Sequence, residues 1–138
     1  PPVFRRSQVW TGGFDAAFKY DGFYALAEYI VRQTAQITPT TPDLTDYGWF
    51  VQAQYFFGSD TPNRGFEILG RWSQIDLDGS GVTVGTDTAV NDITAGVNYL
   101  FNGHRLKIGA NYTYRIETVK AANNVYDQIA QVQFTAIF

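Results

Sequence analysis

The segment D-Q-I-A-Q-V-Q-F-T-A-I-F, residues 127–138, has the alternating pattern of a β-strand. One face carries only apolar side chains, those of Ala130, Val132, Phe134, Ala136 and Phe138. The other face carries Gln131, Gln133 and Thr135, together with Ile129 and Ile137. Soluble proteins seldom end in such a strand, because chain termini are usually frayed and polar. A transmembrane β-barrel places its apolar face against lipid and pairs its last strand with its first, so the segment favours that fold.

The composition narrows the class of protein. The chain has 138 residues, of which 45% are hydrophobic and 17% aromatic. Its net charge of −3 argues against a general nucleic-acid interface. Without cysteine it has no disulfides, thiolate catalysis or cysteine metal sites. No apolar run approaches the roughly 18 residues of a membrane helix, so a membrane crossing would have to use strands.

A period of two recurs along the whole chain, and no helical period of useful length competes with it. It predicts seven strands at residues 10–20, 23–33, 47–57, 66–75, 92–101, 105–117 and 127–138. Most of them are about as long as the roughly 9–11 residues that a tilted strand needs to cross a bilayer. We therefore expect an all-β, antiparallel transmembrane β-barrel of the outer-membrane type.

The connections between these strands alternate in length. Asp21-Gly22 and Asn102-Gly103 are typical of tight hairpins, and residues 58–65 form a shorter turn. Long external loops are expected at residues 34–46, 76–91 and 118–126. Short turns on one side and long loops on the other are typical of outer-membrane barrels. Residues 1–138 would thus form a single β-barrel segment, with residues 1–9 the remnant of an external loop and residues 10–138 its strands and loops.

This arrangement predicts an odd number of strands that begin on the outer side. Bacterial single-chain barrels have an even number of strands. We therefore expect the chain to be the C-terminal part of a larger barrel, starting without an initiator methionine because it is processed or partial. Open strand edges cannot face lipid, so the remaining strands would come from another chain or segment.

The aromatic residues support this orientation. Trp10, Trp49 and Trp72 fall in the outer halves of their predicted strands. An inner belt would contain Tyr55, Phe57, Tyr99, Phe101 and Phe138. Aromatic belts at both interfaces are a feature of membrane barrels. The alternative is an ordinary β-sandwich or lipocalin-like barrel with an aromatic core, because alternation does not say whether the apolar face points to lipid or inward.

The polar faces of the strands would line a pore. Their cations are Lys19, Arg32, Arg71, Arg105, Lys107 and Arg115, and their anions are Asp15, Glu28, Glu67, Asp92 and Glu117. Rings of Arg and Lys favour anions, and Arg105, Lys107 and Arg115 on one strand are the best local candidates. The alternative is cross-strand pairing, for example of Arg71 or Arg32 with Glu28 or Glu67.

Other chemistry finds little support. Asp76-Leu77-Asp78 resembles the start of a calcium loop but lacks the remaining oxygen ligands. His104 is the only histidine, so neither a histidine metal site nor a catalytic triad is supported. We expect no enzyme activity, no metal and no cofactor. The predicted external side is acidic, which is compatible with divalent ions that bridge it to lipopolysaccharide.

Several segments together resemble the C-terminal part of the phosphate-selective porin O/P family. They are G-F-Y-A-L-A-E-Y-I (22–30), G-W-F-V-Q-A-Q-Y-F-F (48–57), F-E-I-L-G-R-W-S-Q-I-D (66–76), I-T-A-G-V-N-Y-L-F-N-G-H-R-L-K-I-G-A-N-Y (93–112) and the closing Q-V-Q-F-T-A-I-F. The resemblance implies a homotrimeric channel of about sixteen strands in the bacterial outer membrane, in contact with lipid and lipopolysaccharide. The family's anion-selecting arginine ladder and constriction loop lie mostly in earlier strands, so phosphate selectivity is not carried over.

Three functions follow as expectations. The first is an outer-membrane porin, or a C-terminal fragment of one, for passive diffusion of small hydrophilic solutes, with anions such as phosphate among the candidates. The second is a non-conducting barrel that acts as a structural anchor or assembly partner. The third is a soluble, ligand-binding β-barrel, which an apolar outer band would exclude.

Overall fold

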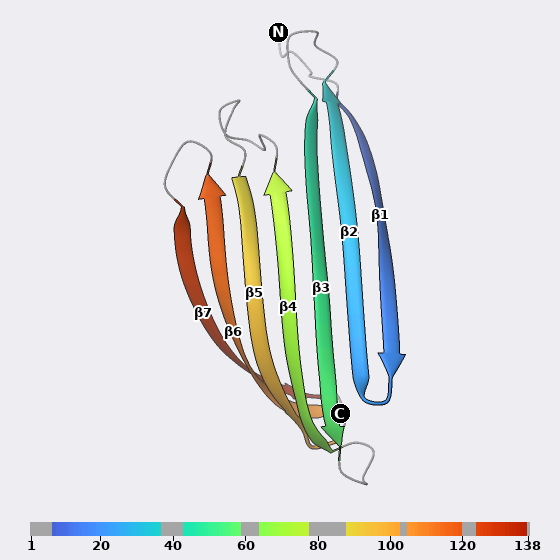
Figure 1. Ribbon diagram of the computed structural model, residues 1–138, viewed down its shortest axis with the longest axis vertical. Coiled ribbons are helices and arrows are strands. Elements are labelled where there is room, and N and C mark those ends of the chain that lie inside the picture. The colour runs from blue at the N-terminus through green and yellow to red at the C-terminus, as the bar shows by residue number, and fades with distance from the viewer. Residues whose placement is uncertain are drawn as a thin grey trace.

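A computed structural model describes residues 7–36, 43–58, 64–77, 88–102, 105–119 and 124–137. They form one antiparallel sheet in which each strand lies beside its neighbours in sequence (Figure 1). The strands are β1 (Ser7–Tyr20), β2 (Phe23–Gln36), β3 (Leu44–Gly58), β4 (Gly65–Leu77), β5 (Thr88–Leu100), β6 (Leu106–Val119) and β7 (Val125–Ala136). All seven predicted strands are present, and the all-β, antiparallel prediction is confirmed.

Six of the seven strands are longer than predicted, mainly at their outer ends, and β7 has the predicted length but begins two residues earlier. β1 begins at Ser7, so residues 7–9 belong to a strand and not to a loop remnant. The expected loop at 34–46 shortens because β2 continues to Gln36 and β3 begins at Leu44. The loops at 76–91 and 118–126 shorten in the same way. Backbone pairing continues into segments rich in Thr, Gln and Asp, where the apolar alternation that reveals a strand has already faded.

The two predicted tight hairpins have different outcomes. Asp21 and Gly22 both have positive φ, 41° and 78°, as a two-residue type I′ hairpin requires. The second connection is wider, because β5 ends at Leu100 and β6 begins at Leu106. Arg105 N–H donates to the carbonyl of Asn102 over 3.2 Å. Gly103 lies outside the described residues, so the two-residue hairpin at Asn102-Gly103 stays a prediction.

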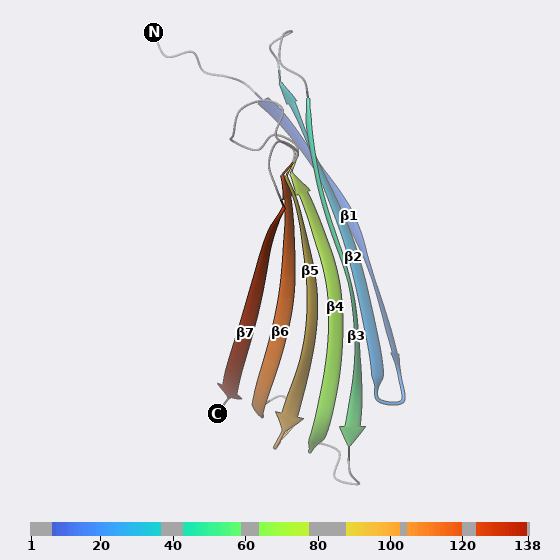
Figure 2. The same ribbon diagram turned by 60° about the vertical axis from the view of Figure 1, so that its left-hand side comes forward.

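The sheet is curved and open. Figures 1 and 2 show the strands bending together, with the end of β7 at the same end of the sheet as the β1–β2 turn. Within the described residues, β1 pairs only with β2 and β7 pairs only with β6. Two edges of backbone donors and acceptors are thus left without a strand partner in the part of the chain that the structure describes.

The sheet has almost no core of its own. Leu100 is the only buried hydrophobic residue among those described. The chain exposes 10094 Å², whereas a compact monomer of this mass would expose about 7,200 Å². A β-sandwich would need a second layer, and the described strands form a single sheet. None of the described residues forms a helix long and apolar enough to cross a membrane.

Candidate functional site

One face of the sheet is apolar and open to its surroundings. Residues opposite one another in antiparallel strands share a face, so the register assigns every side chain to one side. On this apolar face Phe14 is 68% exposed, Phe134 66% and Val132 75%. Burying such side chains is worth about 1.5–3 kcal/mol each, so this face requires an apolar environment. This is the exposed apolar band that we expected to distinguish a membrane barrel from a soluble ligand-binding one.

Aromatic rings gather at two levels of the apolar face. At the inner level, the end with the Asp21–Gly22 turn, the rings of Phe66 and Tyr99 and those of Tyr99 and Phe101 lie 4.7 Å apart. At the outer level the rings of Trp49 and Trp72 lie 5.1 Å apart. The other predicted belt residues follow: Tyr55 packs on Phe57 in the inner belt, Trp10 lies at the outer end, and Phe138 lies outside the described residues.

The two levels are separated by a membrane-like distance. Tyr47 belongs to the outer level, where its ring stacks on that of Tyr29 opposite Trp49. Phe57 of the inner level lies ten positions away from Tyr47 on the same face of β3. At about 3.4 Å per residue and a tilt of about 40°, this corresponds to about 25 Å across a membrane, close to the apolar band of outer-membrane barrels. The spacing fits the predicted pair of belts.

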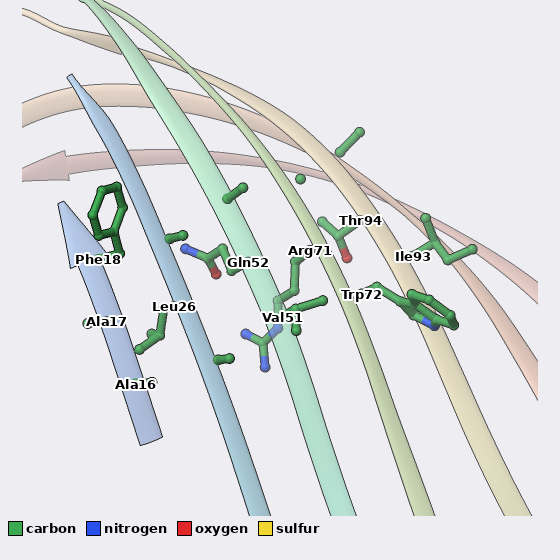
Figure 3. Close-up of a pocket in the computed structure, with 15 residues that line it drawn as sticks. Ala16, Ala17, Phe18, Leu26, Val51, Gln52, Arg71, Trp72, Ile93 and Thr94 are labelled. Carbon is green, nitrogen blue, oxygen red and sulfur yellow. The ribbon is translucent and has the colours of Figure 1, made fainter. Parts of the chain in front are cut away.

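Small residues interrupt the apolar face between the belts. Ala25, Ala53, Gly70 and Ala95 are directly opposite one another on β2 to β5. They floor a hollow of about 730 Å³. Figure 3 shows its bulky margins, Phe18 on one side and Trp72 and Ile93 on the other. A Cβ added to Gly70 would meet nothing within 4 Å, so this part of the face is open.

The opposite, polar face is the concave side of the sheet. The buried side chains of the described strands all lie on it: Asp46, Glu67, Asn98 and Leu100. Side chains converge inside a curved sheet and diverge outside it, as in the filled interior of a barrel. This face contains a hollow of about 750 Å³ whose lining includes Glu28, Arg71, Asp92 and Arg115.

Two arginines of the polar face are held by aspartates directly opposite them. Arg32 on β2 donates to Asp46 on β3, with Nε 2.9 Å from Oδ2. Arg115 on β6 donates to both carboxylate oxygens of Asp92 on β5, each over 2.8 Å. Cross-strand pairing is thus correct for Arg32, but the partner we expected, Glu28 or Glu67, is wrong. Asp46 was missed because the apolar pattern placed it in a loop.

Arg71 and Glu67 are not paired with each other or with an opposite charge in the described residues. The guanidinium carbon of Arg71 lies 4.2 Å from the ring centre of Phe50, which is a cation–π contact. Glu67 accepts from Asn98 Nδ2 over 2.8 Å and from Gln54 Nε2 over 3.4 Å. The buried carboxylate is therefore satisfied by amides and not by an ion pair.

Glycine makes room for this network. Gly109 lies directly opposite Asn98, and a Cβ at that position would collide with Asn98 Oδ1. The missing side chain lets Asn98 lie flat against β6 and reach Glu67. Gly96 faces Asn111 in the same way. Periodicity cannot reveal this, because it depends on which residues of two strands stand opposite each other.

The other predicted pore-lining residues lie at different positions, most of them on the polar face and one of them in a connection between strands. Lys19 and Lys107 lie on the polar face near its inner end, and Glu28 lies opposite Asp15. Arg105 lies in the connection before β6 and not within a strand. The polar face also carries Asp46 and Asp127, which we did not count. The strands therefore bring five cations to this face, Lys19, Arg32, Arg71, Lys107 and Arg115, against seven carboxylates, Asp15, Glu28, Asp46, Glu67, Asp92, Glu117 and Asp127.

No group of three or more His, Cys, Asp or Glu suited to a metal ion occurs among the described residues. His104 and Asp78 lie outside them.

Comparison with known proteins adds one match. The model of a family described as phosphate-selective porin O and P matches residues 6–138. No curated protein and no solved structure gives a significant match.

Proposed function

Because the chain belongs to the phosphate-selective porin O and P family, we propose that its sheet forms part of the wall of a water-filled channel in the bacterial outer membrane. Small hydrophilic solutes would diffuse passively along the polar face. The family is one of channels and not of enzymes, and the described residues of the polar face carry ion pairs and amides.

The observation that supports this proposal most directly is that the two faces of the sheet differ in chemical character. The apolar face exposes large hydrophobic residues between two aromatic levels about 25 Å apart, as lipid contact requires. The same strands place charged and amide side chains on the concave face. A bilayer against the apolar face and water against the polar face satisfy both sets of side chains.

The open edges support a larger assembly. Unpaired backbone groups in lipid cost several kcal/mol each, so β1 and β7 require strand partners in a membrane. We propose that further strands, from another segment or another chain, close the barrel, and that the complete channel is a homotrimer in contact with lipid and lipopolysaccharide.

Phosphate and similar anions are the proposed solutes. Family membership is the main support for this proposal. Three cations of the polar face also have no ion pair among the described residues and can attract anions: Lys19, Arg71 and Lys107. A cation ring lowers the barrier for anions in a pore.

Planar-bilayer recording of the complete protein tests the proposal. Steady conductance, with a reversal potential on the anion side in a salt gradient, is the expected result. A cation-side reversal potential would retain the pore and overturn the anion assignment. A protein that inserts but carries no current would overturn the channel itself.

A further inference from the structure

The charges of the polar face are sorted along the strands. The register places Ala17, Leu26, Gln52, Arg71, Thr94, Thr113 and Ile129 opposite one another in one row. The next row outward contains Asp15, Glu28, Phe50, Ser73, Asp92, Arg115 and Asp127. We call the part of the polar face between the first row and the Asp21–Gly22 end the inner half, and this half includes the first row. The second row and everything outward of it form the outer half.

The two halves have opposite charge. The inner half carries three cations, Lys19, Arg71 and Lys107, and one carboxylate, Glu67. The outer half carries six carboxylates, Asp15, Glu28, Asp46, Asp92, Glu117 and Asp127, and two arginines, Arg32 and Arg115. The boundary falls between two successive rows of the register.

Ion pairing leaves neither arginine of the outer half without an acidic partner. Both outer arginines are already bound to aspartates, Arg32 to Asp46 and Arg115 to Asp92. Asp15 and Glu28 stand directly opposite each other with no ion pair among the described residues. Like charges in that position destabilise a sheet, so folding alone does not account for them. The inner carboxylate, Glu67, is covered by amides and is 6% exposed, which leaves the inner cations to dominate their half.

We propose that this wall makes the channel rectify, so that it passes more current when the outer compartment is positive. The inference rests on the channel function proposed above. Acidic walls admit cations and basic walls admit anions. An outer-positive voltage drives cations in through the acidic half and anions in through the basic half, so both accumulate where the halves meet. The opposite voltage draws both ions away from this boundary, which empties the channel of carriers and lowers the current.

Salt concentration should control the effect. The charges act across the lumen only within a Debye length, which is about 10 Å at 0.1 M salt and about 3 Å at 1 M. In symmetric solutions, the ratio of outer-positive to outer-negative current should therefore exceed one at about 0.1 M and approach one at about 1 M. The orientation of each inserted channel can be read by blocking an Asn124→Cys variant from one compartment with a bulky thiol reagent, because Asn124 is exposed before β7 at the outer end and the chain has no other cysteine.

Two charge-neutralising variants test the assignment to this face. Asp15→Asn/Glu28→Gln/Asp127→Asn should bring the current ratio at low salt toward one and shift the reversal potential toward anions. Lys19→Gln/Arg71→Gln should also lower the ratio, but should shift the reversal potential toward cations. Opposite shifts with the same loss of rectification are the signature of a wall with two charged halves.

Asp76→Asn is the matched control. Asp76 lies at the outer end of β4 but on the apolar face, where it accepts from Tyr47 Oη over 3.0 Å. Asparagine keeps an acceptor for that hydrogen bond, so only the charge is lost. The current ratio and reversal potential should stay unchanged.

The outcomes separate the two proposals. Steady conductance with equal currents at low salt, or with the larger current at outer-negative voltage, would overturn rectification and leave the channel intact. Rectification that survives both neutralising variants would overturn its assignment to this face. A complete absence of conductance would overturn the channel and the inference together.

Discussion

Arg115 on β6 donates two parallel hydrogen bonds to Asp92 on β5, from Nε to Oδ1 and from Nη2 to Oδ2, each 2.8 Å long. The two residues are directly opposite in the register. In the next row inward, the hydroxyls of Thr94 and Thr113 link the same strands over 2.8 Å. The polar face is therefore cross-linked by hydrogen bonds between side chains of neighbouring strands.

Replacing Arg115 by Lys should keep the positive charge but lose the two parallel hydrogen bonds to Asp92. Arg115 and Asp92 are 36% and 22% exposed, so solvent screens the pair and its coupling energy should be only about 0.5–1 kcal/mol. A double-mutant cycle with Arg115→Lys and Asp92→Asn, read from urea unfolding in phospholipid vesicles, measures the part of that energy which arginine adds over lysine. Additive effects of the two single changes would show that the two parallel hydrogen bonds contribute nothing beyond a simple charge pair.

Gly109→Ala should loosen the amide network around Glu67. The added methyl group takes the place of Asn98 Oδ1, so Asn98 must turn away from Glu67. Losing a hydrogen bond to a buried carboxylate, partly offset by the better strand propensity of Ala, should lower the free energy of unfolding by about 1–2 kcal/mol. An unchanged unfolding midpoint would mean that Asn98 does not hold Glu67.

Gly70→Ala is the counterpart on the apolar face and should have the opposite sign. A Cβ at Gly70 meets nothing within 4 Å, and glycine inside a strand costs about 0.5–1 kcal/mol relative to alanine. The variant should therefore be up to about 1 kcal/mol more stable in the same vesicle assay. A loss of stability would reveal that another molecule or chain fills the hollow in the folded assembly.

Trp72 should report the acyl chains of the bilayer. It is 50% exposed on the apolar face, on the side of the outer belt that faces the inner belt. In a variant whose other tryptophans, Trp10 and Trp49, are replaced by Phe, lipids brominated on their acyl chains should quench its fluorescence strongly. Phe50→Trp in a background with all three native tryptophans replaced keeps an aromatic ring under Arg71 on the polar face, and its emission should be quenched far less. Equal quenching at both positions would contradict the assignment of the two faces.

The strands were predictable because their signal is local. Alternation along β6, from Leu106 to Ile116, is enough to place each side chain on one of two faces, and Asp21-Gly22 identifies a hairpin from two residues. The strand ends were less predictable. Asp46 lies beyond the last clear apolar alternation, and its strand is maintained by backbone pairing with β2, which leaves no mark in the local sequence.

The contacts of the polar face depended on register and could not be predicted from one strand at a time. Asp46 binds Arg32, and Gly109 admits Asn98, because these residues stand opposite each other on neighbouring strands. Arg71 turns to Phe50 instead of a carboxylate, a choice set by the neighbours across β3 and β4. The sorting of charge into an inner and an outer half likewise emerged only after all six pairings were known.

We propose that one face of this sheet meets lipid and the other meets water. Thr94 and Ala95 are neighbours on β5 with side chains on opposite faces, and the native chain has no cysteine. Thr94→Cys and Ala95→Cys can therefore be compared in intact outer membranes with a small, charged, membrane-impermeant thiol reagent. We predict rapid labelling at position 94, and labelling at position 95 only after the protein is unfolded. Labelling of position 95 from water, with position 94 protected, would contradict this assignment of the two faces.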